Sequence, residues 1–403
     1  MARKAPVRLS PRLYAVLGLL IMLGPLATSL YVPGLPDLAR SLDVSTAAAQ
    51  VTITTCLAGL AVGQLFIGPI SDRFGRRGPI IAGTAAYLVA SALCAVAPNL
   101  PVLLGLRFLQ GLAGAAGIVV ARAAVRDLSA GTAAAVALSR LLMVTGIAPV
   151  VGPIIGGQLL RFADWRSLFA MLAVTAAGSL IAAIAWFPET LPHDRRTSTG
   201  VGSQLRTMGR LLRDRDVVAS MLVIGLLGGV TFSWMASGPF YFDIEYQMSA
   251  PVFATIVAVA SVAFVLGALA NTRVVRVIGI RPALIRGLVL VAVFCIGVLV
   301  TGLLHLPVWW VVACGVLAMG TYGGMGANAQ ALALTPHGAV AGAVAALLGM
   351  MQFVGGALIP PAATLVFGST WAMGAGMAIA GVGALAVAAL LTRAPRSAEP
   401  ATA

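Results

Sequence analysis

The chain is poor in charged residues. Only 9% of its 403 residues are Asp, Glu, Lys or Arg, whereas a soluble domain carries about 25%. Hydrophobic residues make up 60%, so the polar residues could not cover a water-exposed globule of this size. Apolar runs of about 18–25 residues recur from end to end, and each could cross a bilayer as a helix. The composition therefore excludes a soluble protein and makes the lipid bilayer a partner.

Groups that would hold a metal or a cofactor are also scarce. The four cysteines fall inside apolar runs without the spacing of metal ligands. Buried free cysteine usually behaves as a small hydrophobic residue, so neither a metal nor a disulfide is expected. The sequence has no Gly-x4-Gly-Lys-Ser/Thr phosphate-binding loop, so the chain should not hydrolyse ATP and no cofactor is expected.

Acidic residues are few, with 12 Asp and Glu against 26 Lys and Arg. A net charge of +14 could suit nucleic acid, but the arginines form short clusters between apolar runs. Of the basic residues, 21 fall on one side of the predicted membrane and three on the other. This asymmetry argues against nucleic acid and predicts that both termini are cytoplasmic. The Ala- and Arg-rich, Lys-poor usage suggests a GC-rich bacterial genome.

The apolar runs predict an all-α membrane protein with twelve transmembrane helices. The basic N-terminus resembles a signal peptide, but its apolar run is long and further spans follow, which favours an uncleaved first span. An even number of spans leaves both ends on one side. The spans are expected at 13–31, 49–69, 79–97, 101–122, 133–159, 167–187, 217–237, 252–270, 283–303, 308–332, 339–361 and 370–391.

A single long polar stretch, 188–216, divides the predicted spans into two sets of six. We expect an N-terminal bundle at 1–187, a cytoplasmic linker at 188–216, and a C-terminal bundle with a short tail at 217–403. The string GPISDRFGRR follows span two and GALANTR follows span eight, which places Asp72 and Asn271 199 residues apart. Repeated halves around a linker are typical of transporters whose substrate site lies near the membrane midplane.

The string at 68–77 is the most informative motif. Gly68 would let span two approach a neighbouring helix, and Gly75 would permit a tight turn into span three. Asp72 could cap a helix or pair with an arginine. A plain basic loop would explain the arginines alone, but not the ordered string. The arginines that would hold this loop at the anionic membrane surface are Arg73, Arg76 and Arg77.

These strings resemble the motifs of the major facilitator superfamily. The string at 68–77 is similar to the signature Gly-x-Leu-Ala-Asp-Arg-x-Gly-Arg-Lys. RFLQG at 107–111, the Pro- and Gly-rich string at 149–157, DWR at 164–166 and PETL at 188–191 resemble further motifs, in the family's order. The features that narrow the resemblance to the bicyclomycin/chloramphenicol-resistance (Bcr/CflA) subfamily of drug:proton antiporters include Tyr31-x-Pro33-x-x-Pro36, Gln50, Gly63-Gln64, Arg126-Asp127-Leu128, Ser237-Gly-Pro239, Asn328 and Gln352-Phe353.

The resemblance implies the major facilitator fold, in which two pseudo-symmetric six-helix bundles rock about a central site. It implies a monomeric, non-enzymatic transporter that exports a hydrophobic antibiotic similar to chloramphenicol or bicyclomycin. Export would proceed by alternating access in exchange for protons, with the proton gradient as the energy source.

The same resemblance implies a conformational switch. Asp72 would brace the start of span eleven, and Arg73 or Arg76 would pair with Asp127. In span five, glycines allow close helix contact and prolines bend the helix. Simple tight packing is an equal physical explanation for this stripe. The switch residues are therefore Gly68, Asp72, Arg73, Gly75, Arg76, Arg77, Asp127, Gly152, Pro153, Gly156 and Gly157.

Apolar walls with a few polar groups suit a lipophilic ligand. Arg107 is a charge deep inside a span, so it should face the bundle interior. It is either a structural arginine bonded to backbone carbonyls or, as its motif implies, a residue that couples protonation or substrate binding to the conformational change. The candidate substrate-binding residues are Ser29, Tyr31, Gln50, Thr54, Trp234, Tyr322, Asn328 and Gln352.

A family acid is absent from span one. The subfamily usually carries an acid two residues before the tyrosine, and Ser29 occupies that position here. No other predicted span core contains Asp or Glu. Either a nearby acid carries the proton or coupling differs, and Asp37 is favoured because it is nearest in sequence. The other candidate acids are Asp127, Asp243 and Glu245.

Three alternatives remain. A metabolite exporter or uptake facilitator on the same fold could work without conventional proton coupling. A membrane receptor or scaffold would need a larger soluble region than the linker and tail provide. A membrane enzyme would need a buried His/Glu or Asp/Asp cluster, and none is visible in the sequence.

Overall fold

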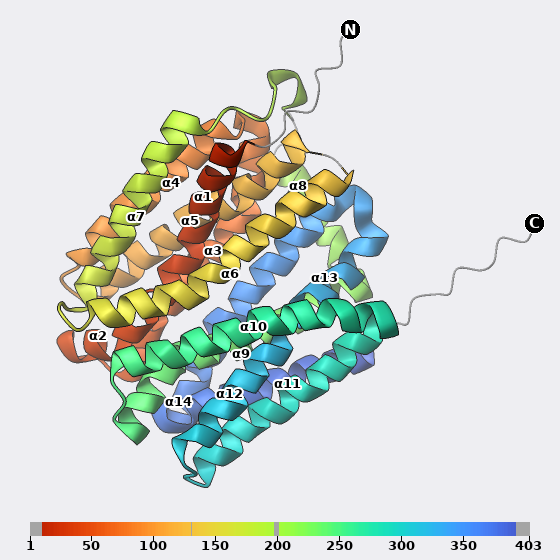
Figure 1. The fold of residues 1–403 in the computed structure, drawn as a ribbon. Coiled ribbons are helices and arrows are strands. Elements are labelled where there is room, and N and C mark those ends of the chain that lie inside the picture. Colours follow the sequence, from red (N-terminus) through yellow and green to blue (C-terminus); the bar gives the residue numbers. More distant parts are fainter. Residues whose placement is uncertain (1–9, 130, 197–200, 392–403) are drawn as a thin grey trace, which may run out of the picture.

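The structure, a computed structural model, describes residues 10–129, 131–196 and 201–391. Helices make up almost all of this part of the chain, which contains no β-strand (Figure 1). The prediction of an all-α protein is therefore confirmed.

The first part of the chain forms seven α-helices and one 3₁₀-helix. They are α1 (Pro11–Ser29), η1 (Val32–Gly34), α2 (Leu35–Ser41), α3 (Thr46–Phe74), α4 (Arg77–Ala95), α5 (Leu100–Leu128), α6 (Gly131–Leu159) and α7 (Trp165–Trp186).

The remaining elements follow in the second part of the chain. They are η2 (His193–Arg195), α8 (Val201–Leu211), α9 (Arg215–Tyr246), α10 (Ala250–Ile278), α11 (Ile280–Leu303), α12 (Val308–Tyr322), α13 (Met325–Leu334), η3 (Thr335–Val340) and α14 (Ala341–Leu391).

Short polar side chains fix the starts of several membrane helices. The first amides of a helix lack partners within it, and a side-chain oxygen at the N-cap can accept from one of them. Ser10 does so for α1, Ser45 for α3 and Asn99 for α5. These caps set where each apolar helix begins.

The last helix contains two membrane crossings. Its 51 residues would span about 76 Å, more than twice the thickness of a hydrocarbon core. Gly368 interrupts it with φ 74° and ψ 169°, a conformation that favours glycine. The helix therefore turns there and crosses the membrane again.

Ten helical stretches in the described residues are long and apolar enough to cross a membrane. One of them, Ala341–Leu390, holds the two crossings divided at Gly368, and α6 is represented there only by Ala148–Leu159. Counting α6 and both parts of α14 gives the twelve predicted crossings.

Two predicted spans differ in detail. The tenth, expected as one helix at 308–332, is interrupted between α12 and α13 at the Gly323–Gly324 pair. The first ends at Ser29, and the Pro- and Gly-containing stretch that follows forms η1 and the short α2 rather than a plain loop. Proline at a first helical position tolerates this restart because its missing N–H is not needed there.

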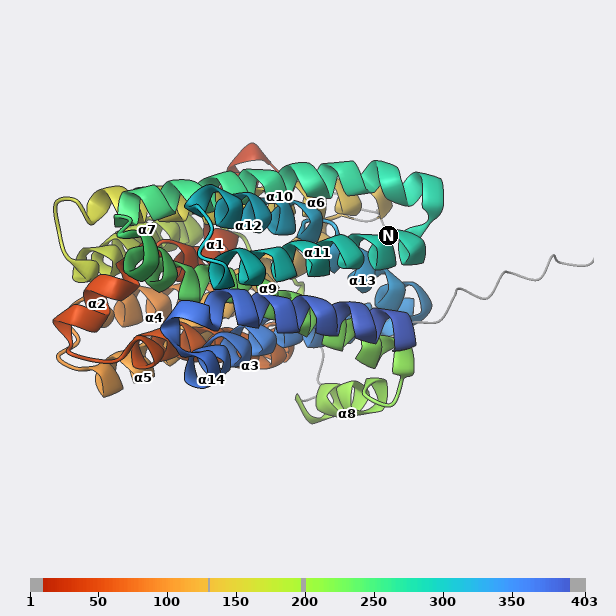
Figure 2. The same ribbon diagram turned by 90° about the horizontal axis from the view of Figure 1, so that it is seen from below.

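The loops lie at the two opposite ends of the helical bundle. The side reached by the start of α1 and the end of α14 is named here the termini side, and the other is the opposite side. Helices α6 and α10 pack together toward the opposite side and separate toward the termini side (Figure 1). The first part of α14 packs along both α3 and α9. Figure 2 shows α8 at the edge of the bundle on the termini side, where it packs against α14 and α3.

The predicted division at 1–187, 188–216 and 217–403 stays a prediction. For the contacts below, α1–α7 are named the N-terminal half and α9–α14 the C-terminal half. The described residues of the linker form η2, α8 and the first residues of α9, and the others lie outside helices.

Candidate functional site

A buried arginine lies at the centre of the N-terminal half. Arg107 of α5 is 0% exposed. Its Nη1 donates to the Ala27 carbonyl at 2.9 Å and to Gln110 Oε1 at 2.6 Å, and its Nε donates to the Thr52 carbonyl at 3.2 Å. The structural alternative for this residue, bonding to backbone carbonyls, is therefore the geometry observed.

Aromatic rings complete the surroundings of Arg107. The guanidinium carbon lies 4.7 Å from the centre of the Tyr31 ring and 5.4 Å from that of Phe169, close enough for cation–π attraction. No acidic side chain in the described ranges forms an ion pair with Arg107, and its Nη2 has no hydrogen-bond partner there. The bundle thus holds a buried cation without a counter-ion.

Tyr31, a candidate substrate-binding residue, does not face a central cavity in this structure. Its side chain is 0% exposed. The hydroxyl forms a 2.9 Å hydrogen bond with Thr52 Oγ1, and the ring packs 4.9 Å from Phe169 of α7. The short η1 turn directs Tyr31 back into the N-terminal half.

Ser29 is also enclosed within the N-terminal half. Its hydroxyl is placed to donate to the carbonyls of Pro25 at 2.9 Å and Ala148 at 3.0 Å, which links α1 to α6. Two glycines of α6 make this contact possible. A Cβ at Gly152 would overlap Ser29 Oγ, and one at Gly156 would overlap the Leu30 carbonyl. Two of the glycines in this stripe therefore serve close packing against α1.

Asp37 lies in α2 and supports the start of α7. Its Oδ2 accepts a hydrogen bond from the Trp165 amide at 3.0 Å, and the residue is half-buried. Within the described residues, no hydrogen bond or ion pair joins Asp37 to Arg107. Its suggested role in carrying protons stays a prediction.

Gln50 of α3 joins the two halves of the molecule. Its Nε2 donates to Ser237 Oγ at 3.3 Å and to the Ala236 carbonyl at 3.4 Å, while its Oε1 accepts from Thr364 Oγ1 at 2.6 Å. Gln50 is 1% exposed. This predicted substrate-binding residue is thus occupied by contacts with α9 and α14.

Further contacts join the halves nearby. Thr54 Oγ1 donates to the Ala357 carbonyl at 2.9 Å, and Ser261 Oγ to the Pro149 carbonyl at 3.0 Å. Gly157 faces α10, where a Cβ would lie 2.8 Å from that of Ala254.

An ion pair lies beyond these contacts, at the opposite side. Arg40 Nη1 and Asp243 Oδ2 are 3.3 Å apart, and both side chains are exposed. Among the described residues, the hydrogen bonds between the two halves lie toward this side. These polar contacts join the halves at the opposite side, while packing of α3 against α14 extends farther, to Gln64 and Gly349.

The candidates from the C-terminal half lie mostly inside it. Trp234 is 1% exposed and packs against Gly315 and, edge-on at 6.0 Å, Phe242. The Tyr322 side chain lies near those of Thr231 and Gln352. Trp234 is therefore a packing residue, whereas Tyr322 and Gln352 form a polar cluster between α12 and α14.

Asn328 does not lie with these residues. It forms a reciprocal amide pair with Asn271, with N–O distances of 3.0 and 3.1 Å. Asn271 is the counterpart of Asp72 in the repeated string, so this pair belongs to the termini side. Asn328 lies in α13, beyond the interruption at Gly323–Gly324 and toward the termini side. This position does not support the expectation that Asn328 contacts substrate.

The motif at 68–77 forms a charged network at the termini side. Arg76 is 5% exposed. Its Nε donates to Asp127 Oδ2 at 2.8 Å, and its Nη1 donates to Ser71 Oγ at 2.7 Å and to Asp72 Oδ1. Arg73 instead stacks on Phe74, 5.3 Å from the ring centre.

Two expectations for this loop are thereby resolved. Of the alternative partners for Asp127, Arg76 forms the pair and Arg73 does not. Asp72 bonds to Arg76 within its own loop, so the expected brace against the start of span eleven is not the contact observed. A Cβ at Gly68 would make only ordinary contact, 3.9 Å from Val119, so close helix approach does not require that glycine.

Glu189 is a functional candidate that the sequence reasoning missed. Its Oε1 accepts from the amides of Arg76 at 2.7 Å and Leu191 at 3.0 Å, and its Oε2 accepts from the Arg77 amide at 3.3 Å. Gly75, at φ 89°, brings the loop so close that a Cβ there would overlap the Glu189 carboxylate. The PETL string was the signal for this role.

The charge of Glu189 is favoured where it lies. Burial alone would raise its pKa, but the amide hydrogen bonds and the nearby Arg196 guanidinium together lower the pKa below its usual value. Thr190 Oγ1 adds a 3.2 Å hydrogen bond to Asp127 Oδ2. The segment after α7 therefore clamps the network.

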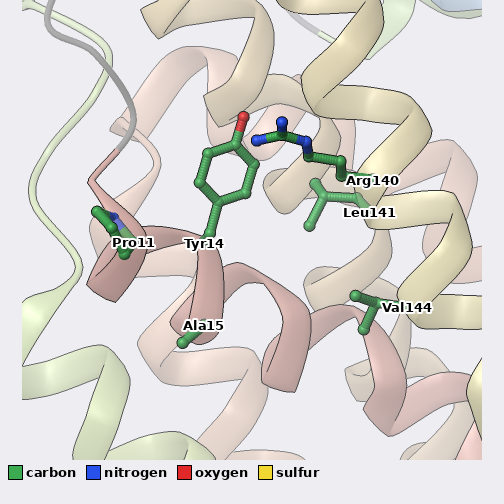
Figure 3. Close-up of a pocket in the computed structure, with 6 residues that line it drawn as sticks. All are labelled: Pro11, Tyr14, Ala15, Arg140, Leu141 and Val144. Atoms are coloured by element: carbon green, nitrogen blue, oxygen red, sulfur yellow. The ribbon is translucent and has the colours of Figure 1, made fainter.

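A pocket of about 480 Å³ lies between the termini-side parts of α1 and α6. Figure 3 shows the Tyr14 hydroxyl and the Arg140 guanidinium directed toward the same space. The guanidinium carbon of Arg140 is 5.9 Å from the centre of the Tyr14 ring, and Arg140 is exposed. A second interior arginine thus borders accessible space.

Comparison with known proteins gives a consistent result. Residues 17–360 match the family described as the Major Facilitator Superfamily. An uncharacterized MFS-type transporter of Bacillus subtilis, YdgK, is 34% identical over 86% of this chain and 87% of its own length. A bicyclomycin resistance protein homolog of Haemophilus influenzae is 30% identical over 85% of this chain and 86% of its own length.

Solved structures support the same fold. The crystal structure of a D-xylose-proton symporter superposes with a TM-score of 0.72, covering 93% of this chain and 96% of that chain. The two sequences are only 16% identical. This similarity therefore concerns the arrangement of the helices.

Proposed function

Because the chain belongs to the major facilitator superfamily, we propose that it exports a hydrophobic, drug-like molecule across a bacterial inner membrane by alternating access. The chain is a transmembrane transporter of that superfamily rather than an enzyme. The proposal of drug efflux is supported by the similarity to a bicyclomycin resistance protein homolog. We further propose that both termini lie in the cytoplasm, on the basis of the arginine asymmetry, and that the chain acts as a monomer, as the family resemblance implies.

The contacts between the halves are the observation that carries the mechanism. Gln50 binds Thr364 and Ser237, and Arg40 pairs with Asp243, all toward the opposite side. Alternating access requires these contacts to break when the opposite side opens. In the proposed orientation, this conformation faces the cytoplasm, and the next conformation releases the molecule outside.

The charges within the membrane favour a neutral or anionic substrate. Arg107 and Arg140 lie well inside their helices, whereas the described Asp and Glu residues lie in loops or near helix ends. A lipophilic cation would meet no negative charge there. Its repulsion from the two arginines would be costly in a low-dielectric site. Neutral compounds similar to chloramphenicol or bicyclomycin fit this description.

Proton antiport is the favoured energy source, with Asp37 as the proposed proton carrier. A facilitator or metabolite exporter without conventional proton coupling is the second candidate. It is favoured by one observation, that Arg107 forms no ion pair with an acidic side chain in the described residues. The two candidates differ in their dependence on the proton gradient.

A susceptibility panel tests the function. The chain is expressed in a host that lacks its own drug pumps, and growth is measured on neutral, anionic and cationic antibiotics with and without a protonophore. Resistance to neutral or anionic compounds that the protonophore abolishes supports the antiporter. Resistance that persists supports the facilitator, and no change in resistance at equal membrane abundance contradicts drug export.

The proton carrier needs a separate measurement. Purified protein is reconstituted in vesicles, and proton flux is recorded after addition of a compound identified by the panel. Loss of drug-induced flux in Asp37→Asn supports this role. Full flux in that variant would assign the proton to another group.

A further inference from the structure

A second and larger groove lies outside the contacts described so far. It has a volume of about 870 Å³ and is bordered by α10, α11, α12 and the start of α13. Small-ligand sites usually measure about 300–1,000 Å³. Helices α10 and α11 are connected at Gly279, and the groove extends from this turn toward the middle of the bundle.

The interruption in the tenth crossing leaves room for the groove. Helix α12 packs between α10 and α11 but ends at Tyr322, and α13 begins at Met325. Gly320 and Met325 form part of the floor. Helix α12 therefore separates α10 from α11 along only part of their length and ends before the Gly279 turn.

The walls of the groove are apolar and directed outward. Leu266, Val274 and Val277 of α10 are 60%, 44% and 83% exposed, and Leu290 of α11 is 46% exposed. Side chains of this kind would be unfavourable in water. In a membrane protein they lie at the level of the lipid chains, so the groove is open to lipid.

Two arginines stand at the termini-side part of this apolar groove. Arg273 of α10 and Arg286 of α11 both line it, and both are exposed. Each lies about 9–10 Å along its helix from the Gly279 turn, at 1.5 Å per residue. Within the described part of the chain, neither forms an ion pair with an acidic side chain. They provide positive charge where lipid headgroups meet the protein.

We propose that this groove binds an anionic phospholipid of the termini-side leaflet. The phosphate would be held between Arg273 and Arg286, and an acyl chain would lie along Leu266, Val274 and Leu290. Basic pockets between transmembrane helices at the cytoplasmic side are suited to anionic headgroups. Charge complementarity distinguishes this occupant from a zwitterionic or neutral lipid.

Binding would influence transport through α10. The same helix contacts α6 toward the opposite side through Ser261 and Ala254. A lipid held between α10 and α11 would stabilise the conformation in which the groove is open. This consequence rests on the proposed transport cycle, but lipid binding itself can be measured without any substrate.

Native mass spectrometry of the purified full-length chain tests the proposal. The protein is mixed with equal amounts of phosphatidylglycerol and phosphatidylethanolamine, and the retained lipid is counted. We expect phosphatidylglycerol to be retained preferentially, and Arg273→Gln/Arg286→Gln to lower its retention about tenfold, since each arginine near a membrane surface contributes appreciably to the binding of anionic lipid. Arg273→Lys/Arg286→Lys should preserve most of the binding.

Two controls separate the groove from general surface charge. Arg12→Gln/Arg195→Gln removes two other exposed arginines from the predicted cytoplasmic side and should leave retention unchanged. Ala270→Phe fills the groove without removing charge, since Ala270 is an exposed lining residue, and should lower retention. The melting temperature of every variant is measured, and lipid retention is compared among variants of equal thermal stability.

Several results would overturn the site. Equal loss in the Arg12/Arg195 control would assign binding to surface charge. Equal retention of both lipids would assign it to apolar contact alone. Unchanged retention in Arg273→Gln/Arg286→Gln would place the lipid elsewhere. Drug resistance does not enter these readouts, so failure of the site and failure of the proposed transport function are distinguishable.

Discussion

Arg76 Nε donates to Asp127 Oδ2 at 2.8 Å, which joins the start of α4 to the end of α5. The pair is almost enclosed, with side-chain exposures of 6% and 16%. Arg76 also binds Asp72 and Ser71, so one guanidinium connects three helix ends. The orientation of these helices at the termini side depends on that single side chain.

Asp127→Asn should therefore reduce export while membrane abundance stays near that of the parent. The change removes a charge-assisted hydrogen bond from a mostly buried guanidinium, and such bonds contribute about 1.5–3 kcal/mol. Asp72→Asn should act in the same direction. Resistance and membrane abundance are measured together, with Arg73→Gln as the control because Arg73 only stacks on Phe74. Normal export by both Asp variants would remove the network from the mechanism.

Gly156→Ala should impair transport and lower stability. The added methyl group would overlap the Leu30 carbonyl, and overpacking of this kind typically costs about 1–3 kcal/mol. Gly178→Ala is the matched control, because a Cβ there meets nothing within 4 Å. It should raise the melting temperature slightly, since alanine favours helix over glycine. Equal behaviour of the two variants would show that close contact between α1 and α6 is unimportant.

Glu189→Gln should destabilise the termini-side loop by about 1 kcal/mol, the usual scale for an acid at a helix N-terminus. The pKa of Glu189 is lowered in the folded protein. Its contribution is therefore complete above the ordinary glutamate pKa of about 4.3 and is lost as pH falls through the lower folded value. Melting temperatures of parent and variant should differ at neutral pH and converge under acidic conditions. A constant difference across that range would mean that the carboxylate charge is not the cause.

Cross-linking across the opposite side should stop transport. Cysteines replace Arg40 and Asp243 in a chain whose four native cysteines are changed to alanine, and a bifunctional thiol reagent joins them. The link holds closed the side that must open, so drug export should fall to background. The matched control links Gln158 and Arg161, which are exposed and belong to one half, and export should continue. Undiminished export by the first linked pair would contradict alternating access through this side.

Arg107→Lys should not restore what Arg107→Gln loses. The guanidinium bonds the carbonyls of Ala27 and Thr52 from two different nitrogens, and a lysine ammonium lacks this fork. We expect both variants to lose most export and about 2 kcal/mol of stability, the scale of a charged hydrogen bond. Resistance and thermal melting are measured in parallel. A lysine variant with parental values would show that charge alone suffices.

The sequence was sufficient for the overall architecture because apolar length and turn residues set the crossings directly. The rotation of each helix was harder to predict. Tyr31 and Trp234 face the interiors of their own halves. Their helices are apolar on nearly all sides, so no polar stripe indicates which face is central.

Local geometry also decided between alternatives that spacing left open. From the sequence alone, either Arg73 or Arg76 could pair with Asp127. The positive φ of Gly75 turns the chain so that Arg76 points inward. The Glu189 carboxylate stabilises that turn by accepting a hydrogen bond from the Arg76 backbone amide. The anchoring acid comes from a segment more than a hundred residues away, which periodicity could not reveal.

The amide pair of Asn271 and Asn328 occupies the second half's counterpart of the charged network. Neither amide titrates, and neither carries a net charge that dissolved ions could screen. Acidification that protonates Glu189 would therefore weaken its hold on the Arg76 turn in one half and leave the Asn271 pair in the other half unchanged. The two halves of the transporter would therefore respond differently to pH, because the contact in one half depends on charge and its counterpart in the other half does not.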